Sequence, residues 1–600
     1  MSTSVSRGRL EIGLSLALIL VAIVVLPLFV CLPPYSDNDF YGIAANYVRK
    51  GYILEKEDRS FYFPPGLALS RLAIDTISGR RHEGIIIADL IVMSMNFALL
   101  VAWFRYRMTR AQAIASWLIL MGFYLTTPEV VHFQPDPWMF LPTIVGLHLR
   151  RRQLPRLFNR DALPIKNVIG WSVLEGMMCG AACLIKPYAI IPMLTIWTVS
   201  SLLALLLNVR NWARTILDVI FLQIGGLIFA LIWLLWLVFD GGLSHFRDTF
   251  LWAYVYQSTA ASWWLKLLAT LTQVMPWSLV HLWTVPLSIM LLIRAFRKAI
   301  RGSQDNADMT VWNEAVYSAF YLAWMIECTF MQVAWIYHIM PGLFSGLGLL
   351  IGHLWSSPAR WPRWVAPTAT TAFAIGLNPL LMPHRLACWT RCFSEGSTPE
   401  LRDEIKNIPY YMPQIVEQVD PVRLEKIVDY GHFDLALAQM HSHLYTVEWK
   451  NMTKVADYLR AQGVKDRDLT CYHNTTLHLF LMLDIVPSNV DIVHDLIVSR
   501  FYGRDVVLQK ALQDCQQRWV VSDLQRATLD EPALPDPAHP LELPANFPDR
   551  WRNRYPWSLP IVFRVGRYCV HDARNPDGSM REVTKLTGLV YDESATGPGE

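Results

Sequence analysis

The chain has 600 residues, of which 53% are hydrophobic and only 17% carry a charge. Soluble proteins carry a charge on about a quarter of their residues, so this composition points to a membrane protein and away from a soluble or nucleic-acid-binding one. The net charge of +3 is too small to indicate a partner by itself. The cysteines show no paired CxxC spacing, and a structural zinc site is therefore not expected.

Long apolar runs recur along the first two thirds of the chain. A run of about 20 apolar residues is long enough to cross the hydrocarbon core of a bilayer. The first run has no small-residue cleavage site, so we expect a retained span and not a removed signal peptide. We predict about eleven spans, near 12–32, 84–104, 111–126, 137–149, 168–185, 188–207, 215–239, 273–293, 313–333, 338–355 and 364–382.

The loops between these runs alternate in charge. Lys and Arg gather in the loops 105–110, 150–156, 208–214, 294–301 and 356–363. The opposite loops carry acidic residues, namely Asp37, Asp39, Glu129, Asp136, Asp240 and Asp248. Because cytoplasmic loops of membrane proteins are rich in Lys and Arg, the N-terminus is expected in the cytoplasm. An odd number of spans then puts everything after Pro383 outside the cytoplasm.

The pattern predicts a mainly α protein with two domains. Residues 1–383 would form a polytopic transmembrane helix bundle, and residues 384–574 an extracytoplasmic α/β domain. In the second domain apolar residues recur at helical spacing over 449–463, and 518–523 and 559–571 are rich in strand-forming residues. Residues 575–600 are expected to be a disordered tail that follows a turn. The outer domain has an odd number of cysteines, so no disulfide is assigned.

The first external loop carries two carboxylates in the stretch Ser-Asp-Asn-Asp at 36–39. Apolar residues then recur at helical spacing up to Gly51, which predicts a helix on the outer membrane surface. A second helix is expected after the Pro-Pro-Gly step at 64–66. Together they would form a floor or lid over a cavity at the bilayer surface. Alternatively, Asp37 and Asp39 merely cap the helix, and the loop serves packing.

Four more residues on the outer side could carry chemistry. Asp136 stands between two prolines where the fourth run begins, and Lys186 lies at the outer end of the fifth. His338 lies at the start of the tenth run, and Arg247 lies in an outer loop. Each of these residues could also have a purely structural role. Asp136 could mark a Pro-flanked helix start, Lys186 or Arg247 could extend to the membrane surface, and the ring of His338 could be hydrogen-bonded within the core. Their common side of the membrane favours a shared site.

These residues resemble the motifs of the GT-C superfamily, integral-membrane glycosyltransferases that use polyprenyl-phosphate-linked sugars. The nearest branch is that of protein O-mannosyltransferases and the lipid A aminoarabinose transferase. The resemblance covers roughly residues 10–380 and departs at Asn38, where many relatives have Glu, and at Phe63, where others have Lys. The matching residues are Asp37, Tyr41, Ala45, Pro64, Pro65, Gly66, Asp136, Lys186, Pro187, Trp335, His338 and Pro341.

The resemblance implies a catalytic role for Asp37. This residue would be the general base that takes a proton from an acceptor hydroxyl or amine as the acceptor attacks the anomeric carbon of the donor. The sugar configuration would invert and the polyprenyl phosphate would leave. The residues that stabilise the leaving phosphate would be Lys186, His338 and Arg247.

The resemblance also implies roles for the acceptor side of the site. Asp136, the second expected catalytic residue, would orient the acceptor or help to hold a divalent metal, which some family members need and others do not. Asp39 could also join such a metal site. No other cofactor is expected. The residues that line the substrate cavity would be Tyr41, Pro65 and Tyr337.

The expected function is that of an inverting glycosyltransferase, moving a hexose or pentose from a polyprenyl-phosphate donor to a lipid, glycan or protein acceptor. The reaction would take place at the outer face of the cytoplasmic membrane. Two alternatives stay open. A transporter or flippase for a lipid-linked or polar substrate would show two symmetric halves and ionisable residues near mid-membrane, and neither is evident in the sequence. A catalytically inactive relative would be a membrane-anchored binding protein that acts through residues 384–600.

Overall fold

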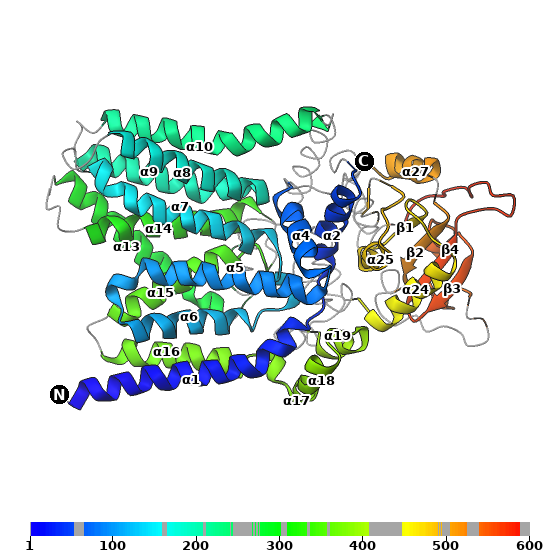
Figure 1. Ribbon diagram of the computed structural model, residues 1–600, viewed down its shortest axis with the longest axis horizontal. Coiled ribbons are helices and arrows are strands. Elements are labelled where there is room, and N and C mark those ends of the chain that lie inside the picture. The colour runs from blue at the N-terminus through cyan, green and yellow to red at the C-terminus, as the bar shows by residue number, and fades with distance from the viewer. Residues whose placement is uncertain are drawn as a thin grey trace, which may run out of the picture.

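The computed structural model has a bundle of long helices at one end and a small α/β domain at the other (Figure 1). The N-terminus lies at the end of the bundle that is farthest from the α/β domain. The structure describes residues 2–52, 65–158, 165–207, 212–239, 242–243, 267, 270–271, 274, 276–301, 309–332, 336–356, 360–406, 447–489, 491–492, 494, 504–515, 517–524, 539, 541–545 and 547–587.

The helices of the bundle run side by side along the long axis of the molecule (Figure 1). Each of the apolar runs expected as a span overlaps one of these helices, because a helix satisfies all its backbone hydrogen bonds within the segment. The overlap is partial for the run 273–293, since α13 begins at His281. In chain order they are α1 (Ser2–Val30), α5 (His82–Trp103), α6 (Arg110–Tyr124), α7 (Pro135–Phe158), α8 (Ile165–Ile185), α9 (Ile190–Leu207), α10 (Trp212–Phe239), α13 (His281–Ile300), α14 (Met309–Ile326), α15 (Met340–Ser356) and α16 (Arg360–Gly376).

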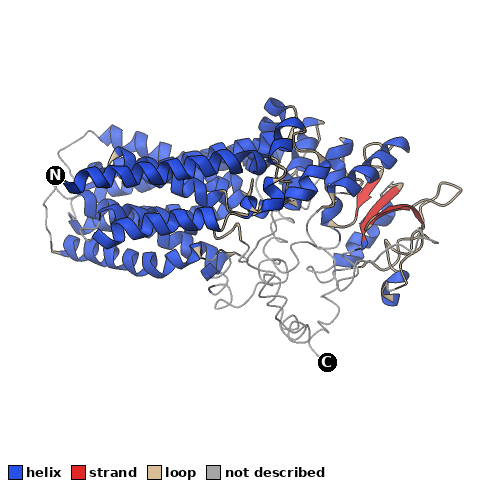
Figure 2. Cartoon of the chain, turned by 90° about the horizontal axis from the view of Figure 1, so that it is seen from below, coloured by secondary structure: helices blue, strands red, loops and turns tan. Residues whose placement is uncertain are grey.

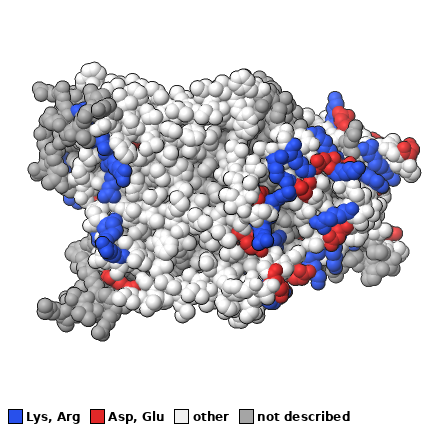
Figure 3. Space-filling model, in the orientation of Figure 1, with Lys and Arg blue, Asp and Glu red and all other residues white. Residues whose placement is uncertain are grey.

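The outer surface of the bundle is apolar. On α1 the side chains of Ile12, Leu16, Leu20 and Ile23 form one stripe and are between 57% and 64% exposed. On the face that Figure 3 shows, the middle of the bundle carries almost no charged residues, and Lys and Arg gather at the end that holds the N-terminus. Six helices of the described part of the chain are long and apolar enough to cross a membrane. The chain is therefore a multi-pass membrane protein; the number of crossings and the orientation stay predictions.

Two shorter helices, α2 (Ser36–Arg49) and α4 (Gly66–Ser78), lie between the bundle and the α/β domain (Figure 1). Both agree with the helices expected in the first external loop. A Cβ on Gly66 would lie 2.4 Å from the carbonyl oxygen of Leu184, so only glycine lets the start of α4 rest on the end of α8. This contact places α4 directly beside Lys186, which follows α8.

The α/β domain is built on a four-stranded mixed sheet with the order β1-β2-β4-β3 (Figure 2). β1 (Leu469–Cys471) pairs in parallel with β2 (Trp519–Asp523), and β4 (Tyr568–Asp572) is antiparallel to both β2 and β3 (Ile561–Val565). The strands expected within 518–523 and 559–571 are confirmed. β1 was not expected, because three residues are too few for an alternating pattern to show.

Short helices lie beside this sheet or between it and the bundle (Figure 1). The helix expected over 449–463 is α24 (Trp449–Ala461), and it buries the apolar residues that recur at helical spacing. The others are α17 (Pro383–Leu386), α18 (Trp389–Ser394), α19 (Pro399–Ile405), α25 (His478–Leu483), α27 (Arg504–Asp514) and α28 (Asp549–Arg552).

Residues 575–587, the first part of the expected tail, lie against the domain, where the Thr587 N–H donates to the Tyr555 carbonyl at 3.0 Å. Residues 588–600 lie outside the described residues, and the domain boundaries stay predictions.

A buried cluster of charged side chains joins four helices of the bundle. Arg150 of α7 donates to Glu175 of α8 at 2.9 Å and to Asp218 of α10 at 2.6 Å, and all three side chains are 0% exposed. Trp197 of α9 donates to Glu175 at 2.6 Å. A Cβ on Gly176 would lie 2.0 Å from the backbone of α10, so this glycine permits the close approach of α8 and α10. Such a cluster was not expected, because its members lie far apart in the chain.

Candidate functional site

Asp37 lies in the first turn of α2, half-buried, and accepts a long hydrogen bond of 3.4 Å from the Tyr337 hydroxyl. The N-cap of α2 is Tyr35, and no side chain makes a capping hydrogen bond there, so the capping alternative for both carboxylates is wrong. Burial raises the pKa of Asp37 to about 7; the Tyr337 hydrogen bond opposes this rise and the negative charge of Asp39 adds to it. A carboxylate with this pKa can accept a proton near neutral pH.

Asp136, at the start of α7, forms a buried ion pair with Lys186. The Lys186 ammonium donates to the two carboxylate oxygens of Asp136 at 3.0 and 2.7 Å, and both side chains are at most 1% exposed. Gln332 completes the arrangement, since its Nε2 donates to Asp136 at 3.0 Å and its Oε1 accepts from Lys186. Gln332 also donates to the buried carboxylate of Glu327. Two residues that are 50 positions apart in the chain, both predicted for the site, therefore lie in direct contact.

His338 and Tyr337 connect this ion pair to Asp37. The Nε2 atom of His338 lies 3.9 Å from an Asp136 oxygen, and its ring meets the Tyr337 ring edge-on at 4.4 Å. The phenol of Tyr41 lies near both carboxylates: burial raises its pKa well above the usual value, and the charges of Asp37 and Asp136 raise it further. We call the set the carboxylate–lysine cluster; its members are Asp37, Tyr41, Asp136, Lys186, Gln332, Tyr337 and His338.

A turn before α7 holds Asp136 in place. Asp89 of α5 accepts hydrogen bonds from the Phe133 backbone at 3.0 Å and from the Trp138 indole at 2.7 Å. Phe133 has a φ of 54°, in the left-handed region that costs a residue with a Cβ some strain, and the bond to Asp89 stabilises it there. The turn and the first residues of α7 are thus fixed to the bundle on both sides of Asp136.

Asn38 links α2 to the same turn. Its amide donates to the carbonyl of His132 at 3.2 Å, and its side-chain oxygen accepts from Gln134 at 3.3 Å. An amide can donate and accept in this way, whereas a carboxylate could only accept. The departure from the Glu of many relatives therefore has a structural role here: it fixes Asp37 relative to Asp136.

The remaining predicted site residues lie apart from these contacts or outside the described residues. Pro65 is buried at the N-terminus of α4, next to the Gly66 contact described above. Arg247 and Trp335 lie outside the described residues. Asp39 points away from the cluster and pairs with His478 of α25 at 2.7 Å. Within the part of the chain that the structure describes, no group of three or more His, Cys, Asp or Glu side chains could hold a metal ion.

The sequence analysis missed Gln332 of the carboxylate–lysine cluster and Glu327, the buried carboxylate that Gln332 contacts. The signal for Glu327 was present, because an ionisable residue inside an apolar run is costly unless it has partners. Gln332 gave no such signal: an amide at the end of a span is ordinary, and only the fold shows that it bridges Lys186, Asp136 and Glu327.

The structure thus combines a bundle of long apolar helices with two short helices and an α/β domain at one end. No family model matches the chain, and no curated protein matches it by sequence. Among solved structures it is similar to ArnT from Cupriavidus metallidurans in the apo state, with 14% sequence identity, a TM-score of 0.51, and coverage of 95% of this chain and 99% of ArnT. A second structure, ArnT bound to undecaprenyl phosphate, gives 13% identity, a TM-score of 0.50, and coverage of 94% and 98%. The resemblance to the GT-C superfamily is thus confirmed at the level of the fold.

Proposed function

We propose that the chain is an inverting glycosyltransferase that moves a sugar from a polyprenyl-phosphate donor to an acceptor hydroxyl or amine. The observation that carries this proposal is the half-buried Asp37, whose pKa lies at about 7, in a chain of contacts that leads to the buried Lys186. The likeness to ArnT, which has been solved with undecaprenyl phosphate bound, supports a donor of this kind.

Asp37 acts as the general base. Its carboxylate takes the proton of the acceptor group as that oxygen or nitrogen forms a bond to the anomeric carbon of the donor. The bond between the anomeric carbon and the phosphate oxygen breaks on the opposite side, so the sugar configuration inverts. The electron pair of that bond leaves with the polyprenyl phosphate, which carries the additional negative charge.

Lys186 and His338 offset this charge. The ammonium of Lys186 already donates to Asp136 and Gln332, so these two residues orient it before any ligand arrives. A donor phosphate would replace one of these acceptors, and it would then bind to a cation that is preorganised and sheltered from water, where its charge acts more strongly. Asp136 positions Lys186 in this scheme, and Arg247 is an additional candidate for the phosphate.

The charges of the loops support a reaction at the outer face of the cytoplasmic membrane. The acceptor would be a lipid, a glycan or a protein. A divalent metal is not needed in this scheme, because Asp37 supplies the base and Lys186 the positive charge. We therefore expect that a chelator such as EDTA leaves the transfer rate unchanged.

The test is a transfer assay on membranes that contain the wild type or the Asp37→Asn variant, supplied with a radiolabelled polyprenyl-phosphate sugar. Asparagine keeps the shape of the side chain but cannot take the proton, so we expect the transfer rate to fall by about a hundredfold or more. The matched control is Asp457→Asn, which removes an exposed carboxylate on α24 that pairs with Arg460 of the same helix.

The same assay separates the alternatives. A transporter or flippase would move the labelled lipid across the membrane without breaking its sugar–phosphate bond. An inactive binding protein would retain its function in the Asp37→Asn variant. If this variant transfers sugar as fast as the wild type, the proposed role of Asp37 is wrong.

A further inference from the structure

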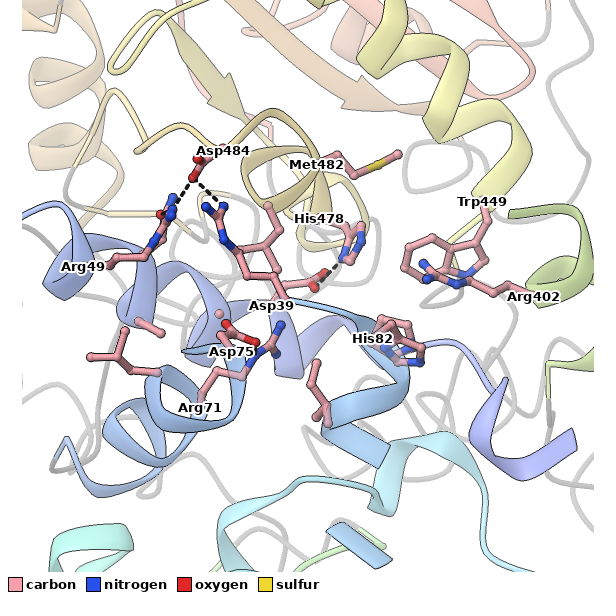
Figure 4. A pocket seen from close by; sticks show the side chains of 18 of the residues that line it. Asp39, Arg49, Arg71, Asp75, His82, Arg402, Trp449, His478, Met482 and Asp484 are labelled. Carbon is pink, nitrogen blue, oxygen red and sulfur yellow. Dashed lines mark hydrogen bonds and ion pairs between the residues drawn. The ribbon is translucent and has the colours of Figure 1, made fainter. Parts of the chain in front are cut away.

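A polar cavity lies on the opposite side of α2 from Asp37. Its volume is about 260 Å³, and it is enclosed by α2, α4 and the start of α5 on one side and by α19, α24 and α25 on the other (Figure 4). Asp39, Gly42, Asn46 and Arg49 of α2 line it. Since each helical residue turns the chain by 100°, these positions lie on one face, and Asp37 lies on the other.

The carboxylates of this cavity are all paired with cationic or titratable side chains. Asp39 contacts His478 at 2.7 Å, and Asp75 contacts Arg71 at 3.0 Å. Asp484 has two partners, Arg80 at 3.0 Å and Arg49. Each negative charge of the lining is therefore neutralised within the protein.

Arg402 of α19 also lines the cavity, and it takes part in none of these ion pairs. Its Nε donates to the Ser397 hydroxyl at 2.8 Å, and its guanidinium lies over the Trp449 ring at 4.8 Å. No carboxylate among the described residues forms an ion pair with it. The side chain is half-buried and lies at the wall of the cavity beside Trp449 (Figure 4). Burial lowers the pKa of Arg402, and the negative charges of Glu83 and Asp39, which lie beyond ion-pair distance, offset this only in part. An anion in the cavity would therefore stabilise the guanidinium further.

The guanidinium of Arg402 has donors beyond Nε. Its two terminal nitrogens carry N–H groups that no hydrogen bond among the described residues uses. A forked guanidinium with several N–H groups suits a ligand group with several acceptor oxygens. Phosphate is such a group.

We propose that this cavity, named here the Arg402 cavity, binds a phosphate-bearing ligand and that Arg402 anchors the phosphate. Asn46 and the apolar side chains of Ile85, Leu481 and Met482 would contact the body of the ligand. The site goes beyond the proposed function, because the donor phosphate belongs to Lys186 on the other face of α2. A ligand in the cavity touches α2 and the α/β domain together, so it would stabilise their contact.

The test measures binding of inorganic phosphate to the full chain, purified in detergent without phosphate buffer, by isothermal titration calorimetry. All proteins carry Lys186→Gln, which removes the phosphate site proposed at the carboxylate–lysine cluster. We expect Arg402→Gln to weaken phosphate binding by at least about tenfold, the usual effect of losing a charged hydrogen bond. The matched control is Arg391→Gln on α18, which removes an arginine that pairs with Glu395 and Glu404 and does not line the cavity.

A second arm identifies the source of the phosphate group. The same proteins are placed in nanodiscs of phosphatidylcholine with or without phosphatidic acid, and lipid retention is measured. Dependence on Arg402 with inorganic phosphate indicates a soluble ligand, and dependence only with phosphatidic acid indicates a lipid headgroup. If Arg402→Gln does not fold, Arg402→Lys keeps the charge but loses the fork, and we expect it to bind several-fold more weakly. Equal binding by the Arg402 and Arg391 variants in both arms would overturn the proposal.

Discussion

Asp37 and Asp39 are separated by one residue, yet their surroundings give them different chemistry. Asp37 faces Tyr337 and the ion pair of Asp136 and Lys186, and its pKa is raised to about 7. Asp39 faces His478 of the α/β domain. Side chains two positions apart on a helix point in nearly opposite directions. The sequence motif alone therefore could not show which carboxylate is the base and which one contacts the α/β domain.

The raised pKa of Asp37 leads to a prediction about pH dependence. The base must be ionised, so activity should rise as pH increases through about 7. In Tyr337→Phe the hydrogen bond that lowers this pKa is lost, and the midpoint of the rise should move upward by about half to one pH unit. The measurement is kcat/KM across pH for both proteins. A midpoint that stays in place or moves downward would contradict the assignment of Asp37 as the titrating base.

Single residues could be predicted from the sequence where an ionisable side chain stands at the end of an apolar run, because burying its charge costs free energy unless it has a partner. Asp136, Lys186 and His338 stood out in this way, and the structure brings all three together. Gln332 did not stand out, because it is neutral and because two of its three partners, Lys186 and Asp136, are 146 and 196 residues away. The roles of these residues in catalysis stay predictions until activity is measured.

Among the elements, α2 separates the carboxylate–lysine cluster from the Arg402 cavity. One face carries members of the carboxylate–lysine cluster and the other face lines the Arg402 cavity. Its helical spacing and its end near Gly51 could be predicted from the sequence. Its second partner could not, because Asn46 contacts a backbone carbonyl 439 residues away. Long-range docking of this kind leaves no periodic signal in the sequence.

Gly66 provides a prediction at the level of elements. In Gly66→Ala the new Cβ would overlap the Leu184 carbonyl, so α4 must move away from the end of α8, next to Lys186. We expect a loss of about 1–3 kcal/mol in the free energy of unfolding and a lower transfer rate. Thermal unfolding in detergent measures the first, and the transfer assay the second.

The control for this prediction is Gly170→Ala in α8. No atom lies within 4 Å of the Cβ that it would add. Alanine is also the better helix former, so stability should stay the same or rise by up to about 1 kcal/mol. If Gly66→Ala behaves like Gly170→Ala, the close contact between α4 and α8 does not exist in the protein.

Taken as a whole, the molecule is a bundle that depends on buried polar contacts as well as on apolar packing. The spans and the α/β domain could be read from the sequence because hydropathy and periodicity record them directly. The cluster of Arg150, Glu175 and Asp218 could not, since each of these residues lies in a different helix. Being fully buried and mutually paired, the cluster suits a structural role better than a transport path.

Removing Arg150 should therefore destabilise the whole bundle. In Arg150→Met two buried carboxylates lose their shared cation, and we expect a loss of about 3–5 kcal/mol in the free energy of unfolding. Adding Glu175→Gln and Asp218→Asn to the same chain removes the unpaired charges and should restore part of the stability. Thermal unfolding of the three purified proteins measures both effects. Recovery by the triple variant is the critical result, because simple loss of packing would not be repaired by it.

The most direct test of the account is a single-turnover measurement with a labelled polyprenyl-phosphate sugar on the wild type, Asp37→Asn and Lys186→Gln. The account predicts that the wild type binds the donor and transfers the sugar with inversion. It predicts that Asp37→Asn binds the donor with similar affinity but does not release the sugar, and that Lys186→Gln binds the donor poorly. Sugar transfer by Asp37→Asn at the wild-type rate, or transfer with retention of configuration, would contradict it.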